Sequence, residues 1–203
     1  MTEEEFYGPA LTGMKWAEQT ILNIAGAYEW ERGQAENGRT ILYQTSRIKT
    51  PESMRNKLKS RKLETDAHSA LTQVHDAVGV RIVCAFSDDV YKVADWLKTR
   101  PEFRVVMTKD YFAHPKPNGY RSYHMIVLLP TPQGEELSAE IQIRTIATDF
   151  WATLEHQLKY KRQVAHEELI RSELKRCADE IASVDLSMQT IRDMIQGEDK
   201  NQE

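Results

Sequence analysis

The stretch "AVGVRIVCAF", residues 77–86, decides the fold class of this chain. Its apolar side chains alternate from Val78 to Phe86, but Val83 and Ala85 between them are apolar as well. A strand with two apolar faces is typical of the interior of a sheet that is covered on both sides. We therefore predict a central strand over these residues.

The residues that follow predict a helix and a second strand. We expect Ser87-Asp88-Asp89 to cap a helix, whose apolar stripe runs from Val90 to Leu97. Arg100-Pro101 ends this helix before the strand-like stretch "FRVVM", residues 103–107. The order strand, helix, strand predicts an α/β fold.

A hairpin is predicted between residues 122 and 144. The stretches 122–130 and 136–144 flank the turn sequence "TPQGE". In the second stretch the residues from Leu137 to Ile143 alternate as an apolar face, and four polar residues share the opposite face: Ser138, Glu140, Gln142 and Arg144. The predicted fold is thus a mixed central β-sheet flanked by helices.

A basic block precedes the central strand. Residues 39–62 contain eight cations and one acid, Glu52. The stretch 42–49 alternates like a strand and places Arg47 and Lys49 on one face, and Thr50-Pro51 then begins a helix. On that helix, three polar side chains share a face: Ser53, Lys57 and Arg61.

Helices are predicted at both ends. Residues near 11–36 form an amphipathic helix that stops at Asn37-Gly38, and residues 146–158 form another. From Ile170 to Ile195 apolar residues follow steps of four and three, the spacing of a coiled-coil seam. The favoured interpretation is that this tail packs on residues 11–36 of the same subunit; the alternative is a direct contact between subunits.

Composition limits the classes of function. The longest apolar runs, among them residues 125–129, are far shorter than the roughly 20 residues that span a bilayer. The amino terminus lacks a basic region and an apolar stretch, so we expect a cytoplasmic protein without membrane contact. The net charge of −4 disfavours broad adhesion to nucleic acid. Cys84 and Cys177 have no partners at metal-binding spacing and are interpreted as core residues.

The loop "HPKPNGYRSYH", residues 114–124, is stiffened by two prolines and an Asn-Gly pair. It carries four potential cations and no acid: His114, Lys116, Arg121 and His124. Such a loop suits phosphate, and the ring of Tyr120 suits stacking on a base. In the alternative interpretation Tyr120 and Tyr123 only anchor a strand and the cations lie on a solvated face.

Two acids are candidates for a metal site. Asp76 directly precedes the central strand, and Glu140 lies on the polar face of the hairpin. Two carboxylates together with substrate phosphates are a usual set of ligands for Mg²⁺, although acids before strands are more often structural. The common phosphate-binding, hydrolase and dinucleotide-binding signatures are absent from the sequence.

Four blocks occur in the order and spacing of the RelA/SpoT synthetase domain: "TSRIKTPES" (45–53), "HDAVGVRIVCAF" (75–86), "KDYFAHPKPNGYRSYH" (109–124) and "EIQIRTIATDFWATLEHQLKYK" (140–161). The short chain resembles the small alarmone synthetases of this family. The resemblance implies an N-terminal helical segment (1–40), a nucleotidyltransferase-like catalytic domain (41–162) and a C-terminal helix (163–203). It implies transfer of pyrophosphate from ATP to the ribose 3′-hydroxyl of GDP or GTP, which gives AMP and the alarmone ppGpp or pppGpp.

The resemblance also implies roles for individual residues. Asp76 would bind Mg²⁺, and Glu140 would assist it and take the proton of the 3′-hydroxyl. Arg47 and Arg81 would sandwich adenine. The remaining ATP-binding residues would be Lys49, Ser53, Lys57 and Arg61. The GDP- or GTP-binding residues would be Lys109, Lys116, Asn118, Tyr120, His124 and Gln142, with Tyr120 against guanine.

Some properties stay open at this point. Relatives are often ring-like tetramers assembled through terminal helices, so a homo-oligomer is expected, with a tetramer favoured. An alarmone is a candidate allosteric ligand, but Asp149 stands where some relatives with that site have Asn. One alternative function is a non-catalytic module that binds alarmone or single-stranded RNA; another is an enzyme that uses an adenine nucleotide or the tRNA 3′ end as acceptor.

Overall fold

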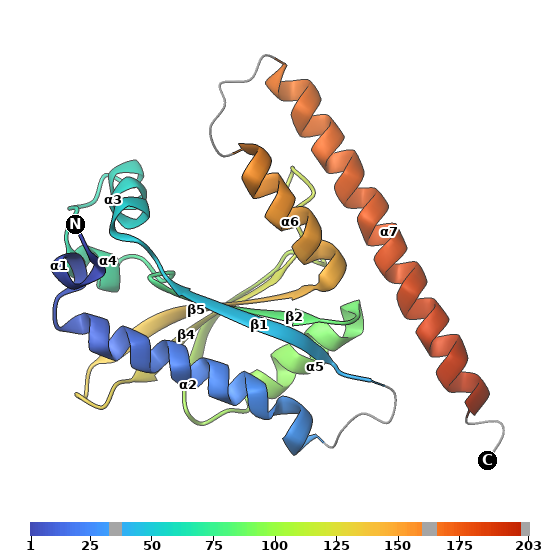
Figure 1. Cartoon of the computed structure of the whole chain (residues 1–203), viewed down its shortest axis with the longest axis horizontal. Helices are drawn as coiled ribbons and strands as arrows, with labels where there is room; N and C mark the ends of the chain where they lie inside the picture. The colour runs from blue at the N-terminus through green and yellow to red at the C-terminus, as the bar shows by residue number, and fades with distance from the viewer. Residues whose placement is uncertain (33–37, 160–165, 200–203) are drawn as a thin grey trace.

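A computed structural model describes residues 1–32, 38–159 and 166–199 of the chain (Figure 1). In chain order, the elements are α1 (Glu3–Tyr7), α2 (Ala10–Glu31), β1 (Ile41–Ile48), α3 (Pro51–Ser60), α4 (Ala67–Thr72), β2 (Val78–Cys84), α5 (Ser87–Lys98), β3 (Arg104–Asp110), β4 (Tyr123–Pro130), β5 (Glu136–Thr145), α6 (Ile146–Lys159) and α7 (Glu167–Asp199). The first long helix ends at Glu31, with Arg32 as its C-cap, which is earlier than the stop predicted at Asn37-Gly38; residue 37 itself lies outside the described residues.

Within these ranges, five strands form one sheet in the order β1-β2-β5-β4-β3. β2 and β5 run parallel, and the other neighbouring pairs are antiparallel. β2 therefore has a hydrogen-bonded strand on each side, as predicted for residues 77–86. The prediction of a mixed sheet flanked by helices is confirmed.

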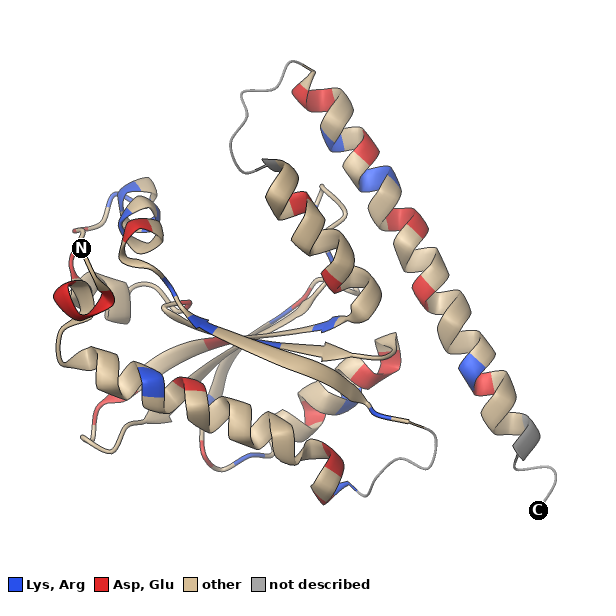
Figure 2. Cartoon of the chain, viewed as in Figure 1, with Lys and Arg blue, Asp and Glu red and all other residues tan. Residues whose placement is uncertain are grey.

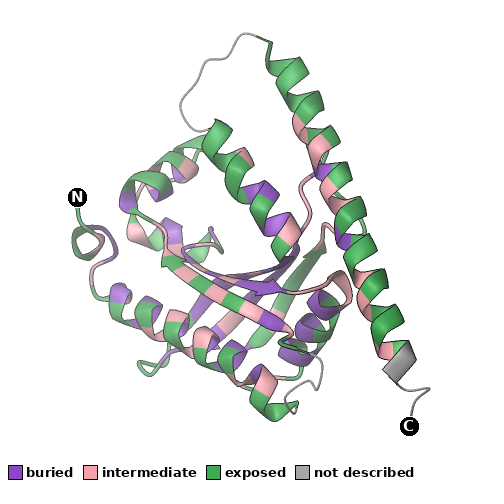
Figure 3. Cartoon of the chain, turned by 45° about the vertical axis from the view of Figure 1, so that its right-hand side comes forward, coloured by how far each residue is buried: buried purple, intermediate pink, exposed green. Residues whose placement is uncertain are grey.

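The two faces of the sheet differ in chemistry. α2 and α5 cover one face (Figure 1), and their residues Met14, Ile21 and Val93 belong to one core cluster with Ile82 and Ile141, all of them fully buried. Because side chains alternate along a strand, the residues between these apolar positions point to the other face. That face carries polar side chains, and Figure 3 shows buried residues concentrated on the sheet and on the inner sides of α2 and α5.

Local sequence explains one helix start and fails to explain another. Thr50 caps α3 by accepting a hydrogen bond from the backbone N–H of Ser53, and Pro51 is the first helical residue, as predicted. Ser87, however, does not cap α5. The capping position is Phe86, and the N–H of Asp88 instead donates to Gln189 Oε1 of α7 at 3.0 Å. A contact distant in sequence thus replaces the expected local cap.

The favoured interpretation of the C-terminal helix is wrong. α7 packs on α6 and on the start of α5, whereas α2 lies across the opposite face of the sheet (Figure 1). The apolar stripe of α2 is already covered by the sheet, so it is not available to α7. Much of the seam on α7 is exposed (Figure 3): Val184 by 60%, Met188 by 52% and Ile195 by 57%.

None of the helices in the described part of the chain is long and apolar enough to cross a membrane.

Candidate active site

A polar pocket of about 90 Å³ opens on the face of the sheet opposite α2. Its walls come from β1, β2 and β5, together with Asp76 just before β2. The lining residues are Thr45, Ser46, Arg47, Asp76, Gly79, Val80, Arg81, Glu140 and Gln142. The predicted catalytic acids Asp76 and Glu140 therefore share one pocket with the predicted adenine-binding arginines Arg47 and Arg81.

Strand register explains why these side chains meet. One row of paired residues crosses the sheet from Arg47 through Gly79 to Glu140. A second row, two residues further along each strand, joins all five strands: Thr45, Arg81, Gln142, His124 and Lys109. Two residues of strand correspond to about 7 Å, so the predicted donor and acceptor residues occupy neighbouring rows of one surface.

Asp76 is held by two lysines from the basic block. Lys49 Nζ donates to Asp76 Oδ2 at 2.8 Å and Lys57 Nζ donates to the same atom at 2.5 Å. Figure 2 shows the basic positions on α3 and on the adjoining end of β1. Burial alone would raise the pKa of Asp76, but the hydrogen bonds and charges of the two lysines outweigh it and hold that pKa below its usual value.

The second oxygen of Asp76 is unusual. Asp76 Oδ1 is buried and, among the residues that the structure describes, has no hydrogen-bond partner. A buried carboxylate oxygen without a partner is costly, and a bound cation would satisfy it. A cluster of three or more metal-binding side chains is not present in the described ranges. Two acids that line one pocket nevertheless suit Mg²⁺, which is usually bound by one or two carboxylates together with phosphates.

Glu140 is oriented at both of its oxygens. His124 Nδ1 lies 3.0 Å from Glu140 Oε1, and Gln142 Nε2 donates to Glu140 Oε2 at 2.7 Å. Burial alone would raise the pKa of Glu140, but the hydrogen bond and charge of His124 outweigh it and lower that pKa. Glu140 is therefore an ionised acceptor at neutral pH.

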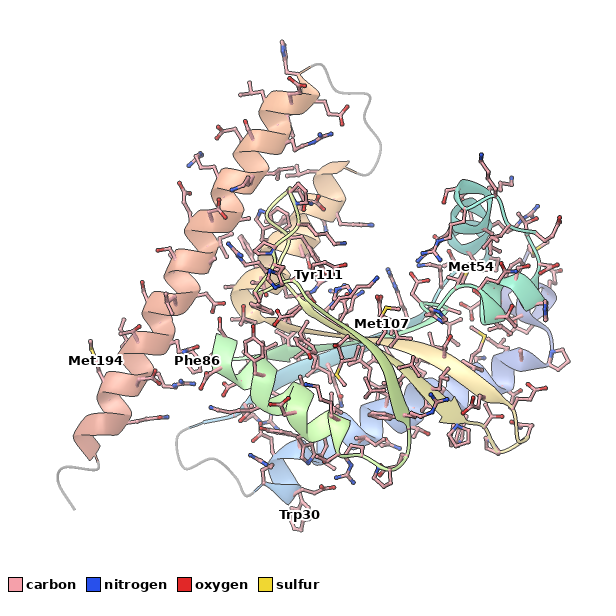
Figure 4. All side chains as sticks on the ribbon, turned by 180° about the vertical axis from the view of Figure 1, so that it is seen from behind. Trp30, Met54, Phe86, Met107, Tyr111 and Met194 are labelled. Atoms are coloured by element: carbon pink, nitrogen blue, oxygen red, sulfur yellow. The ribbon has the colours of Figure 1, made fainter. Side chains whose placement is uncertain are left out.

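The β3–β4 loop, residues 111–122, brings Tyr120 to the edge of this surface. The Tyr120 hydroxyl lies 2.8 Å from His124 Nε2 and accepts from Arg144 Nη2 at 2.9 Å. Lys116 Nζ lies 4.9 Å from the centre of the Tyr120 ring and 4.7 Å from that of Tyr111, which stands where the loop begins (Figure 4). Cations against aromatic rings form favourable contacts.

Four other predicted residues are not among those that line the pocket. Ser53 and Arg61 are exposed on and just after α3; Ser53 is bonded to Thr50, and Arg61 Nη1 donates to the carbonyl of Gln73. Lys109 is exposed on β3. Asn118 Nδ2 donates to Glu155 Oε1 of α6 at 3.0 Å. The loop cations are not all left for a ligand either, since Arg121 pairs with an acid of α7.

Sequence reasoning missed a buried ionic cluster beside the pocket. Asp149 Oδ1 lies 2.8 Å from Arg144 Nη1 and 3.1 Å from Arg81 Nη1, and Asp149 Oδ2 accepts from the Tyr43 hydroxyl. Arg144 could have been found, because it shares the alternating polar face with Glu140. Asp149 and Tyr43 lie 106 residues apart, and nothing in their local sequence pairs them.

Comparison with known proteins decides the family. Residues 46–165 match the family model described as the region found in RelA / SpoT proteins. The chain belongs to the RelA/SpoT family. Two curated members from Bacillus subtilis (strain 168) are similar to it. GTP pyrophosphokinase YwaC is 44% identical over 68% of each chain, and GTP pyrophosphokinase YjbM is 36% identical over 95% of this chain and 90% of the relative.

A solved small alarmone synthetase has a similar fold. The crystal structure of small alarmone synthetase 1 from Bacillus subtilis bound to its product pppGpp has a TM-score of 0.81 and 34% identity, and the match covers 95% of this chain and 97% of that one. The same synthetase bound to AMPCPP has a TM-score of 0.75 and 30% identity, over 92% and 96% of the chains. The resemblance drawn from the four sequence blocks is confirmed.

Proposed function

We propose that this protein is a GTP pyrophosphokinase that transfers pyrophosphate from ATP to the 3′-hydroxyl of GDP or GTP. The products are AMP and the alarmone ppGpp or pppGpp. One observation carries the proposal: Asp76 and Glu140 line a single pocket between the basic block and the β3–β4 loop. The activities named for YwaC and YjbM support it, as do pppGpp and AMPCPP in the related crystal structures.

ATP occupies the side of the pocket formed by β1, β2 and α3. Arg47 and Arg81 stack on the adenine, whereas Lys49 and Lys57 leave Asp76 to neutralise the phosphates. Arg61 and Ser53 reach the phosphates from the same side of α3. The two lysines are already paired with an acid that lines the pocket, so short side-chain movements transfer their positive charge from that carboxylate to the nucleotide.

Asp76 and Glu140 would hold Mg²⁺. The buried, unpartnered Oδ1 of Asp76 and the oxygen-only chemistry of the two acids fit this ion. When bound, the ion supplies positive charge to the phosphates that react. The chain itself contributes the position of its two acids and the surrounding cations.

Glu140 acts as the general base. Its free lone pairs accept the proton of the ribose 3′-hydroxyl while that oxygen attacks the β-phosphorus of ATP, and the bond from that phosphorus to the α-phosphate oxygen breaks to release AMP. A carboxylate is a weak base for an alcohol, so its orientation matters more than its pKa. His124 and Gln142 fix that orientation.

The acceptor nucleotide binds along the β3–β4 loop. Its base stacks on Tyr120, while its sugar and phosphates contact the polar residues Lys109, Lys116, Asn118, His124 and Gln142. Stacking tolerates any base, so the choice of guanine depends on further hydrogen bonds. An adenine nucleotide or a tRNA 3′ end remains the competing acceptor.

The test offers purified protein ATP and Mg²⁺ together with GDP, GTP, ADP and deacylated tRNA in competition. We expect AMP and a guanosine product carrying pyrophosphate at the 3′ position to appear in equal amounts. Preferred labelling of ADP or tRNA would replace the proposed acceptor. Binding of nucleotides without release of AMP would indicate a non-catalytic module that senses alarmone or holds RNA.

Self-association is part of the proposal. Exposed apolar side chains on α6 and α7 border a groove of about 520 Å³ lined by Ile146, Ala147, Phe150, Glu180, Ile181 and Val184. A second copy of the same helices, as in a tetramer, would cover this surface. Light scattering should report a multiple of the mass of one chain. We place the reaction in the cytoplasm, where its nucleotide substrates are found.

A further inference from the structure

The β3–β4 loop rests on α6 and α7, two helices that do not line the polar pocket. Arg121 Nη2 donates to Asp179 Oδ1 of α7 at 3.2 Å, and Lys175 Nζ donates to the other oxygen of Asp179. On the α6 side, the amide of Asn118 is bonded to Glu155. Side chains from both helices therefore hold the loop on the two sides of its turn.

Between these polar contacts the backbones of the loop and α7 almost touch. Gly119 has a φ of +88°, and a Cβ built on it would lie 2.5 Å from Ala178 Cβ and 3.4 Å from Lys175 Cα. Real atoms do not approach so closely, so only glycine fits in the loop and only a small side chain fits at position 178. The position of the turn is thus set directly by the position of α7.

Tyr120 follows this turn and packs in the same contact. Its ring lies against a small hydrophobic cluster formed by Trp151, Ala152 and Ala178, separate from the main core. Trp151 Nε1 donates to the carbonyl of Leu174, which joins α6 to α7 inside that cluster. The ring proposed to stack on the acceptor base is therefore supported from below by α6 and α7.

α7 is also anchored at a distance from the loop. Asp185 is buried and accepts from Thr145 Oγ1 at 2.7 Å and from Ser87 Oγ at 3.2 Å. Further along, Arg192 makes two hydrogen bonds to Asp88, at 2.8 and 3.0 Å, and lies 4.5 Å from the centre of the Phe86 ring (Figure 4). These contacts fix α7 to β5 and α5, so the helix can serve as a rigid support.

We propose that α7 is a positioning element for the acceptor nucleotide: through Ala178 and Asp179 it holds Gly119, Tyr120 and Arg121 in the conformation that receives the base. This inference rests on the proposed function, because it concerns the acceptor side of the same site. It predicts that substitutions on α7 weaken binding of the acceptor nucleotide and leave binding of ATP unchanged, since neither Ala178 nor Asp179 lines the polar pocket.

The steric contact is tested with Ala178→Leu, and Ser183→Leu at an exposed position of α7 is the matched control. Calorimetry measures the dissociation constant of AMPCPP, and then that of GDP for the protein saturated with AMPCPP. Overpacking against Gly119 should raise the dissociation constant of GDP by about tenfold. AMPCPP affinity and both affinities of the control should stay within about twofold. Unchanged GDP affinity, or equal weakening of both ligands, would overturn the proposal.

The ion pair provides a test that does not depend on core packing. Asp179→Arg and Arg121→Asp each place like charges together. Each should weaken the affinity for GDP by about three- to fivefold, as expected for a partly exposed pair. The double swap restores an opposite pair and should recover most of the affinity. Two equally weak single variants without recovery in the double variant would contradict a direct contact.

These measurements separate the inference from the proposed activity. They record binding, so a protein that binds both ligands and obeys the expected pattern but releases no AMP would refute the pyrophosphokinase and retain the role of α7. If the protein released AMP and every α7 variant bound GDP as tightly as the unaltered protein, the role of α7 would be refuted and the pyrophosphokinase retained. If the unaltered protein failed to bind GDP in the presence of AMPCPP, both would fall.

Discussion

His124 joins Glu140 to Tyr120: its Nδ1 lies 3.0 Å from Glu140 Oε1, and its Nε2 lies 2.8 Å from the Tyr120 hydroxyl. Because the pKa of Glu140 is lowered, the carboxylate is an acceptor and Nδ1 carries the proton. The proposed base and the proposed stacking ring are thus oriented by one imidazole before any substrate binds.

Replacing Glu140 with Gln should abolish most of the turnover and spare the donor site. The amide keeps the shape of the side chain but cannot take a proton, and general-base catalysis typically contributes about 10²- to 10⁴-fold. We expect kcat to fall by at least about 100-fold. AMPCPP binding should persist. Glu136→Gln, an exposed position on the same strand, is the control; full activity of Glu140→Gln would reject its role as base.

The lack of a side chain at Gly79 should matter for the binding of the donor nucleotide and not for the stability of the fold. A Cβ at this position would meet only ordinary contacts, at 3.9 Å or more from Arg47, yet it would project into the pocket beside Glu140. Glycine in a strand costs about 0.5–1 kcal/mol relative to alanine. Gly79→Ala should therefore unfold at an equal or higher temperature while its affinity for AMPCPP falls.

The control for this prediction is Gly26→Ala on α2, where the added Cβ would lie 3.5 Å from Gln44 Nε2. It exchanges the same two residue types on the opposite face of the sheet and should leave nucleotide affinity unchanged. A Gly79→Ala protein that binds AMPCPP as well as the unaltered protein would show that the space above Gly79 is not occupied by the donor.

The sequence predicts the sheet better than it predicts the docking of the helices. Alternation along residues 77–86 and 136–144 identifies which side chains share a face, and the register of neighbouring strands then aligns Glu140 with Gly79. The apolar seam of α7 shows only that the helix needs a partner. Its actual contacts depend on Trp151, Asp88 and Thr145, which carry no mark in the sequence that points to α7.

The same limit applies to the site. Asp76, Glu140 and Tyr120 are identifiable from their positions in blocks that resemble a known family, and the structure brings them to one surface. The cluster of Asp149 with Arg81, Arg144 and Tyr43 is formed by residues from β1, β2, β5 and α6, so it appears only after the chain has folded. The periodicity of a sequence shows which side chains share one face of a helix or strand. It does not show which charged residues of other elements will lie against that face.

Tyr120 should tolerate loss of its hydroxyl better than loss of its ring. Tyr120→Phe removes hydrogen bonds to His124 and Arg144 and should lower kcat by about tenfold with little change in the KM of GDP. Tyr120→Ala removes the stacking surface, worth about 1–3 kcal/mol per base, and should raise that KM by about 5- to 150-fold. Steady-state kinetics with saturating ATP separates the two. Identical behaviour of both variants would argue against stacking.

Acid should destabilise the ligand-free protein through Asp76. Burial alone would raise the pKa of this carboxyl group, but Lys49 and Lys57 hold it below its usual value in the folded protein. In the unfolded chain an aspartate titrates near about pH 3.9. The unfolded state therefore binds the proton first, so the contribution of Asp76 is complete above about pH 4 and is lost as the pH falls through the lower folded pKa.

Urea unfolding in the presence of a chelator, at several pH values from neutral to about 3.5, measures this effect as the difference in unfolding free energy between the unaltered protein and Asp76→Asn. That difference should shrink with acidification.

Asp89 provides a control of opposite sign, because burial raises its pKa. Its folded state binds the proton more tightly, so ionised Asp89 weakens the fold as the pH rises above about 4, and Asp89→Asn should gain relative stability there. A pH-independent difference for Asp76→Asn would mean that the two lysines do not hold this carboxylate in solution.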